Sequence, residues 1–196
     1  LSTAVAGNKK FMTINAAKVL AERAIVESVI GLKIRTTERV EDMVAVHQRI
    51  DAKTAANIKG IDYSDIVYDK SKDIAKVTAR INLGRVTNIV GKSINWGNRT
   101  IERVAFATST PSNAGPLRAL RAAELDAYSQ LAKRIIGFNL QSDTTVENFI
   151  LRNDLAKTRL LAAIYGARLV GYRWDADGDA YVKLSLTLGE VEDILG

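Results

Sequence analysis

The hydrophobic positions of this chain occur twice, in the same order, about 106 residues apart. Ile30-Gly31 returns as Ile136-Gly137, and after one deleted residue the apolar positions of residues 77–86 return at a spacing of 105 in residues 182–191. A fixed spacing of this length, present in two copies, is typical of two similar domains in tandem and not of a solenoid. Because glycine and apolar positions are what the copies share, the pattern predicts a duplicated fold.

Each copy predicts the same elements. Apolar residues at helical spacing indicate two helices, each ended by a glycine, and alternating apolar and polar residues around a polar turn indicate a β-hairpin. In the first copy, a short strand, two helices and the hairpin are expected at residues 11–14, 15–30, 38–59, and 63–68 with 74–86. In the second copy, two helices and the hairpin are expected at residues 117–136, 145–165, and 167–174 with 180–191.

The fold class that follows is α+β, a tandem duplication of a β-α-α-β-β unit with its helices packed on one face of a small antiparallel sheet. Between the copies, residues 87–96 and 100–109 are expected to be strands, and residues 110–116 a turn-rich boundary. The predicted domains are a flexible tail, a first repeat, a β-rich linker with a strand, and a second repeat, at residues 1–10, 11–86, 87–115 and 116–196.

Composition and charge narrow the class of protein. Hydrophobic residues make up 47% of the 196 residues and charged residues 26%, as in a folded soluble protein. The longest apolar stretches fall well short of the roughly 20 residues that a membrane helix needs. The net charge of +6 is spread thinly along the chain, whereas nucleic-acid-binding proteins concentrate Lys and Arg into a stripe. No nucleic-acid partner is expected.

Cysteine and histidine content restricts the chemistry. The chain has no Cys and one His, which excludes disulfides, thiol catalysis and cysteine-ligated zinc. Ala4-Val5-Ala6 has the small-x-small pattern of a signal-peptidase site, so removal of a signal peptide and an extracytoplasmic location are expected. A flexible tail of small residues explains the same three residues equally well.

Candidate catalytic or metal-binding residues have simpler explanations. An EF-hand loop starting at Asp175 would place Ala180 where glycine is required and Leu186 where glutamate is required, so a solvated hairpin turn is favoured. His47 lies in the middle of a predicted helix and is interpreted as structural. The acidic residues Glu22, Glu27, Glu38, Glu41 and Asp42 fit solvated helix faces. No catalytic, cofactor or metal site is predicted, and Asn98 begins only a weak glycosylation sequon.

Exposed apolar and aromatic residues are the candidates for contact between subunits. Aromatic side chains gather around the predicted strands, where packing or subunit contact is favoured over stacking on a base or sugar. The strands near residues 10–14 and 100–109 are expected to be able to extend a neighbour's sheet. The candidate assembly contacts are Phe11, Ile14, Trp96, Phe106, Tyr172 and Trp174.

The second copy contains six spaced motifs in order: Arg121-Ala122-Ala123-Glu124-Leu125-Asp126-Ala127-Tyr128-Ser129-Gln130-Leu131-Ala132, Ile136-Gly137, Thr144-Thr145-Val146, Asn153-Asp154, Tyr165-Gly166-Ala167-Arg168-Leu169-Val170 and Asp177-Gly178-Asp179-Ala180-Tyr181-Val182. Through them, residues 117–191 resemble the family of small outer-membrane-associated lipoproteins that includes the flagellar basal-disk protein FlgP. The resemblance implies an α+β, extracytoplasmic, non-enzymatic protein that assembles into rings or disks. The family's lipidated N-terminal cysteine is missing here.

Two functions remain open from the sequence. The first is a structural protein that self-assembles outside the cytoplasm into a ring, tube or filament, because the chain combines a duplicated unit with no predicted active site. The second is a monomeric or dimeric periplasmic module that contacts the outer membrane, peptidoglycan or flagellar components. The two differ in whether the chain's main partner is itself.

Overall fold

The computed structural model describes residues 2–31, 60–83, 99–137 and 163–195, together with the single positions 146, 152 and 160. It mixes helices with two antiparallel sheets, so the predicted α+β class is confirmed. The elements are α1 (Ser2–Gly31), β1 (Asp62–Asp69), β2 (Ile74–Asn82), β3 (Thr100–Ala107), the 3₁₀ turn η2 (Pro111–Asn113), α4 (Ala114–Ile136), β4 (Arg168–Trp174), β5 (Ala180–Ser185) and α7 (Leu188–Leu195).

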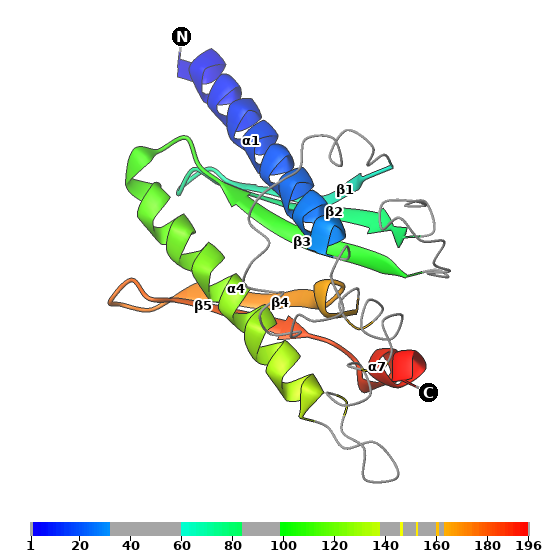
Figure 1. The fold of residues 1–196 in the computed structure, drawn as a ribbon. Coiled ribbons are helices and arrows are strands. Elements are labelled where there is room, and N and C mark those ends of the chain that lie inside the picture. Colours follow the sequence, from blue (N-terminus) through cyan, green and yellow to red (C-terminus); the bar gives the residue numbers. More distant parts are fainter. Residues whose placement is uncertain are drawn as a thin grey trace.

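The first sheet has the strand order β1-β2-β3, and α1 lies across one of its faces (Figure 1). Buried and more exposed residues alternate along β2 and β3. The odd-numbered residues are the buried ones, as in the pairs Ala75–Ala107 and Ala79–Arg103. Ala17 and Ala21 of α1 are fully buried. Because alanine has no side chain beyond Cβ, the helix can lie close to the sheet.

The second sheet is the hairpin β4-β5, and α4 crosses it on the same side of the molecule as α1 (Figure 1). The buried residues of α4 recur every three or four positions and form one stripe: Leu120, Glu124, Tyr128, Ala132 and Ile135. Gly137 ends the helix, as predicted. Buried residues of both halves join in one core, which includes Ile25, Val77, Ile101 and Leu160.

The beginning of the chain differs from the prediction. Residues 11–14, expected as a strand, and residues 2–10, expected as a tail, all belong to α1, so the predicted strand is wrong. The Thr13 hydroxyl donates to the Lys9 carbonyl one turn earlier and also to Asp73, 60 positions later. Thr13, Ala17 and Ala21 therefore continue one buried stripe into the segment that local propensity alone assigns to a strand.

The end of β5 also differs from the prediction. The expected strand at residues 180–191 stops at Ser185, and α7 follows. Thr187 Oγ1 accepts a hydrogen bond from the Glu190 backbone, while the Glu190 carboxylate accepts one from the Thr187 backbone. This reciprocal pair is a capping box, which begins a helix. The segment at residues 110–116, expected as turns, is η2 followed by the first residues of α4.

The other predicted strands are largely confirmed. The first hairpin turns at residues 70–73, the second at residues 175–179, and β3 occupies most of the predicted strand at 100–109. The helix at 38–59 and the strand at 87–96 lie outside the described residues, and of the helix at 145–165 only Val146, Arg152, Leu160 and residues 163–165 are described, all helical. None of the helices described is long and apolar enough to cross a membrane.

Candidate functional site

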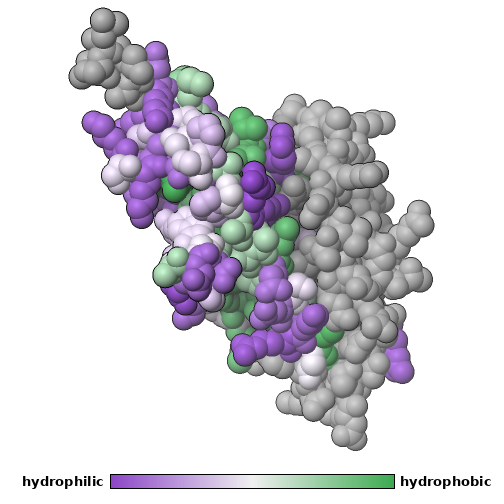
Figure 2. Space-filling model, turned by 90° about the vertical axis from the view of Figure 1, so that its left-hand side faces the viewer, coloured by the Kyte–Doolittle hydropathy of each residue, from purple (hydrophilic) through white to green (hydrophobic). Residues whose placement is uncertain are grey.

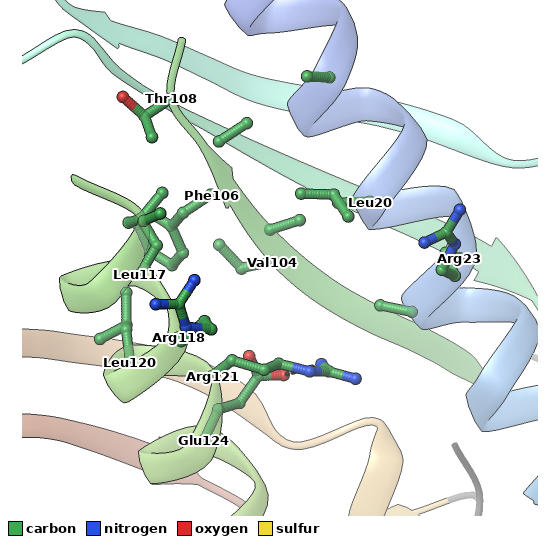
Figure 3. Close-up of a pocket in the computed structure, with 15 residues that line it drawn as sticks. Leu20, Arg23, Val104, Phe106, Thr108, Leu117, Arg118, Leu120, Arg121 and Glu124 are labelled. Carbon is green, nitrogen blue, oxygen red and sulfur yellow. Dashed lines mark hydrogen bonds and ion pairs between the residues drawn. The ribbon is translucent and has the colours of Figure 1, made fainter. Parts of the chain in front are cut away.

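A groove of about 500 Å³ lies between α1, β3 and α4 (Figure 3). Five consecutive residues of the chain, 104–108, line it. Because side chains alternate between the two faces of a strand, consecutive residues border a groove only when it runs along the strand's edge. In the described part of the chain, β2 is the one strand paired with β3, and it occupies the opposite edge. The groove therefore runs along the edge of β3 that faces α4.

The walls of the groove are apolar and its rim is basic. The apolar lining comes from Leu20 of α1, Val104 and Phe106 of β3, and Leu117 and Leu120 of α4. The charged lining consists of Arg23, Arg118, Arg121 and Glu124. Figure 3 shows Arg118 and Arg121 projecting from α4 on the side that faces β3 and α1. An apolar groove with a few converging polar groups is typical of a binding site.

A buried ion pair lies between the two helices beneath this groove. The Arg103 side chain of β3 is 1% exposed, and its Nη2 donates to Glu124 Oε1 of α4 at 2.7 Å. Its Nη1 donates to Ser28 Oγ of α1 at 2.8 Å. The guanidinium also lies 5.0 Å from the ring centroid of Tyr128. Arg103 thus connects the first sheet to both long helices.

The electrostatics of this cluster keep Arg103 charged. Burial alone would lower the pKa of the guanidinium, but the neighbouring Tyr128 and Glu124 raise it above its ordinary value. Burial also raises the pKa of the Tyr128 hydroxyl, which therefore stays neutral. Removing either partner of a buried ion pair leaves an uncompensated charge in a medium of low dielectric constant, which costs about 3–5 kcal/mol. The cluster is structural, since its charges are engaged with each other.

A second polar cluster closes the end of the groove at Thr108. The Thr108 hydroxyl donates to the carbonyl of Asp73, which is 5% exposed and has a positive φ of 53°. The Asp73 carboxylate accepts hydrogen bonds from the side chains of Thr13, Tyr68, Ser109 and Thr110 and from the backbone of Ser109. Burial alone would raise the pKa of Asp73, yet these hydrogen bonds hold it well below its ordinary value. They join α1, the first hairpin and the chain after β3.

Three of the predicted assembly contacts lie together. The Phe106 ring, which borders the groove, lies 4.7 Å from the Tyr172 ring, and Tyr172 lies 6.1 Å from Trp174, measured between centroids. Lys76 Nζ lies 5.7 Å from the centroid of Tyr172. Tyr172 remains 41% exposed. Figure 2, which faces the side of the molecule with the turn after β3, shows apolar surface in a broken band bordered by hydrophilic side chains.

The remaining predicted contacts are dispersed. Phe11 lies on the outer face of α1 and is 66% exposed, beside Met12 at 64%. Ile14 instead packs against the core. Trp96 lies outside the described residues, as do His47 and Asn98. The structure therefore separates the predicted contacts into an aromatic cluster and an exposed patch on α1.

The acidic turn after β4 has the structure of a hairpin turn. Asp175 Oδ1 accepts hydrogen bonds from the backbone N–H groups of Asp177 and Asp179, both at 2.9 Å, and its Oδ2 accepts one from Tyr181. The carboxylate thus closes its own turn. Among the described residues, no group of three or more His, Cys, Asp or Glu side chains is arranged to hold a metal ion.

The Arg103–Glu124 pair and the groove above it were not predicted from the sequence. A signal for the pair is present: Arg103 occupies an inward position of an alternating strand, and Glu124 lies in the apolar stripe of a helix. Charged residues at buried positions are rare unless they are paired. Which residues pair with which, however, depends on how the helices lie against the sheet.

Comparison with known proteins adds no relative. No family model matches the sequence, no curated protein matches it significantly, and no solved structure gives a significant match to the fold.

Proposed function

We propose that this protein is a non-enzymatic structural protein that self-assembles into a ring, tube or filament. The observation that carries the proposal is the exposure of apolar side chains on two surfaces. On α1, Phe11, Met12 and Val19 are 66%, 64% and 54% exposed. On the hairpin β4-β5, Val170 and Tyr172 are 53% and 41% exposed. Exposed apolar patches with polar borders are typical of protein–protein contact sites.

The positions of the two surfaces favour an open or ring-like assembly. The first turns of α1 project beyond the first sheet, and the hairpin β4-β5 lies at the other end of the molecule's layered part (Figure 1). Two different surfaces that contact each other make a head-to-tail interface. Such an interface produces a ring if the rotation between copies closes and a filament if it does not.

The tandem duplication belongs to the same proposal, because two similar domains offer related but distinct surfaces. Several spacings support it. β4 begins 106 residues after β1, and the half-buried residues 180, 182 and 184 of β5 lie 105 residues after the buried residues 75, 77 and 79 of β2. The buried stripe of α4 follows that of α1 at a spacing of 107, as with Ala132 and Ile25. Both hairpins also contain a register shift in their first strand.

The location we propose is extracytoplasmic, after removal of a signal peptide, with the outer membrane, peptidoglycan or flagellar components as further partners. Its support is the resemblance of residues 117–191 to outer-membrane-associated lipoproteins. A protein made of repeated contacts between copies requires no cofactor, and none is proposed.

A monomeric or dimeric binding module is the alternative, and the groove favours it. The groove is concave, apolar inside and lined by Arg23, Arg118 and Arg121, the last of which contacts Glu124 at 3.5 Å, and its basic lining suits an anionic ligand with an apolar part. The two functions differ in oligomeric state, since a binding module keeps one small mass at every concentration.

The test is sedimentation velocity over a wide range of protein concentrations, followed by negative-stain electron microscopy. We expect polymers that grow with concentration, and we expect the double variant Phe11→Ser/Met12→Ser to raise the concentration needed for polymers at least about tenfold, the equivalent of about 1.4 kcal/mol per contact. Both side chains are exposed, so the melting temperature of the monomer should not change. Asn15→Ser, on the same helix and also exposed, is the control. A wild-type chain that stays monomeric or dimeric at all concentrations would refute self-assembly in favour of the binding module.

A further inference from the structure

We propose that the acidic strand β1 of one copy docks on the basic outer face of the hairpin β4-β5 of the next copy. The inference rests on the proposed self-assembly and adds a charged contact to it. Both surfaces consist of exposed side chains, and their opposite charges decide which surface meets which.

The accepting surface is the face of β4-β5 that points away from α4. Residues 180, 182 and 184 of β5 are half-buried, and Trp174, which pairs with residue 180, donates from its indole nitrogen to the Pro116 carbonyl of α4. Because side chains alternate between the two faces of a strand, the intervening residues point outward. This basic face consists of exposed side chains: Arg168, Arg173, Tyr181, Lys183 and Ser185. The two strands contain no Asp or Glu.

Arg173 and Tyr181 form an ordered pair on the basic face. The Arg173 guanidinium lies 4.0 Å from the centroid of the Tyr181 ring, and the Tyr181 hydroxyl donates to Asp175 at 3.2 Å. A guanidinium held over a ring can still donate to a carboxylate from the edge of its plane. Because its fork is already ordered, it loses less conformational freedom when it does so.

The docking surface is β1, the edge strand of the first sheet. Its eight residues include no Lys or Arg and three carboxylates, Asp62, Asp65 and Asp69. Asp62 and Asp65 are exposed, and between the carboxylates the apolar Ile66 and Val67 are 44% and 54% exposed. The strand therefore offers both negative charge and apolar contact to a partner.

Arg80 of β2 lies opposite Asp62 but does not neutralise β1. Its Nη2 contacts Glu102 of β3 at 2.7 Å, and its Nε donates to the same carboxylate at 2.8 Å. The charge of Arg80 is thus engaged on the side of β2 that faces β3. The carboxylates of β1 remain available to cations of another copy.

The turns of the two hairpins carry charges opposite to those of their strands. The turn after acidic β1 contains Lys70 and Lys72, and the turn after basic β4 contains Asp177 and Asp179, all exposed. Two such hairpins that lie strand against strand and turn against turn bring opposite charges together in both places. Such complementarity fixes the register of a contact and raises the rate of association. Two β1 strands, or two β4-β5 hairpins, would instead bring like charges together.

The positions of the two hairpins make this a contact between copies. β1 is separated from β4 by β2 and β3, so the two surfaces lie at different ends of the layered structure (Figure 1). Each copy can therefore dock through one hairpin and accept through the other, which is a head-to-tail interface. The turn after β1 also lies beside α1, since Lys9 Nζ is 3.7 Å from Asp73 Oδ2, so the charged contact adjoins the exposed patch of that helix.

Charge reversal tests the contact. Asp62→Lys on β1 and Lys183→Glu on β5 change exposed side chains, so each variant should fold with an unchanged melting temperature. We expect each single change to raise the concentration needed for polymers at least about tenfold. The double variant Asp62→Lys/Lys183→Glu should recover polymers, because the attraction forms again with the signs exchanged. Asp126→Lys and Lys133→Glu make the same changes of charge at exposed positions of α4, and both controls should assemble as the wild type does.

Carbodiimide cross-linking distinguishes the outcomes, because it joins carboxylates to lysines that are in direct contact. In mixed polymers of isotope-labelled and unlabelled chains, we expect peptides in which Asp62 or Asp65 of one label is joined to Lys183 of the other. Lys183→Arg keeps the charge, so this variant should form polymers and lose the cross-link. Polymers that lack the cross-link and tolerate both charge reversals would overturn the contact between β1 and β4-β5 while self-assembly stands. A wild-type chain without polymers would overturn both proposals.

Discussion

Each half of this protein packs a helix against an antiparallel sheet, but the two halves bury their sheets to different extents. In the first half, Ala75, Val77 and Ala79 of β2 are fully buried under α1. In the second half, the corresponding face of β5 is only half-buried under α4, and the neighbouring strand exposes Val170 and Tyr172. Both halves contribute residues to the core, but the hairpin of the second half also leaves apolar side chains exposed.

The difference has a physical cause in the number of strands. In the described part of the chain, β2 is flanked by β1 and β3, whereas β4 and β5 have only each other. A two-stranded hairpin shields little apolar surface and is at best marginally stable without packing against other elements. The second half therefore depends on contacts with the first, which include the buried Arg103–Glu124 pair.

The largest effect is expected from breaking that connection between the halves. Arg103→Met should lower the free energy of unfolding by about 3–5 kcal/mol, because Glu124 then loses its buried partner and retains the more exposed Arg121 at 3.5 Å. Urea denaturation followed by circular dichroism measures the change. The double variant Arg103→Met/Glu124→Leu should lose less than the single variant, since no charge remains unpaired. A double variant that is less stable than Arg103→Met would contradict this account.

A smaller, pH-dependent effect is expected within the first half. The hydrogen bonds to Asp73 lower its pKa, so its stabilising contribution is complete above the unfolded pKa of about 4 and is lost as the pH falls below it. Asp73→Asn should lower the free energy of unfolding by about 2–3 kcal/mol at pH 7, because an amide accepts fewer hydrogen bonds than a carboxylate. Asparagine tolerates the positive φ at this position, so the backbone is kept.

Urea denaturation at pH 7 and pH 3 separates the charge of Asp73 from the rest of the cluster. The wild type should lose more stability than Asp73→Asn over this interval, because at position 73 only the wild type has a carboxylate that takes up a proton in the unfolded state while it stays ionised in the folded state. Asp177→Asn, exposed in the second hairpin turn, is the matched control and should follow the wild type. Equal losses in the wild type and Asp73→Asn would show that Asp73 does not carry the acid sensitivity.

The smallest effect on stability is expected in the second half. Tyr172 is exposed although it contacts Phe106 and Trp174, so Tyr172→Ser should change the free energy of unfolding by no more than about 1 kcal/mol. Its effect on assembly should be larger, and sedimentation velocity measures it. Lys183→Ser, exposed on the neighbouring strand, is the control. Loss of the monomer's fold in Tyr172→Ser would place this residue in the core instead.

Much of the fold could be predicted because its signals are local. Both hairpins follow from alternation on each side of a polar turn, and α4 from an apolar stripe that Gly137 ends. The prediction of a strand at residues 11–14 was wrong. In the helix that forms there, Thr13 contacts Asp73, and local propensity does not include a contact between residues 60 positions apart. The aromatic residues Phe106, Tyr172 and Trp174 were predicted individually as contacts, but nothing local indicated that Tyr172 would contact both other rings.

By itself, the sequence determined the α+β class, the repeated spacing and most strand boundaries, because periodicity and turn chemistry act between near neighbours. Only the tertiary structure decided how the helices and sheets pack against one another. The groove beside β3, the buried Arg103–Glu124 pair and the separation of an acidic edge strand from a basic groove depend on how α1 and α4 lie against the sheet. Those positions depend on contacts between residues far apart in the chain, which no local pattern specifies.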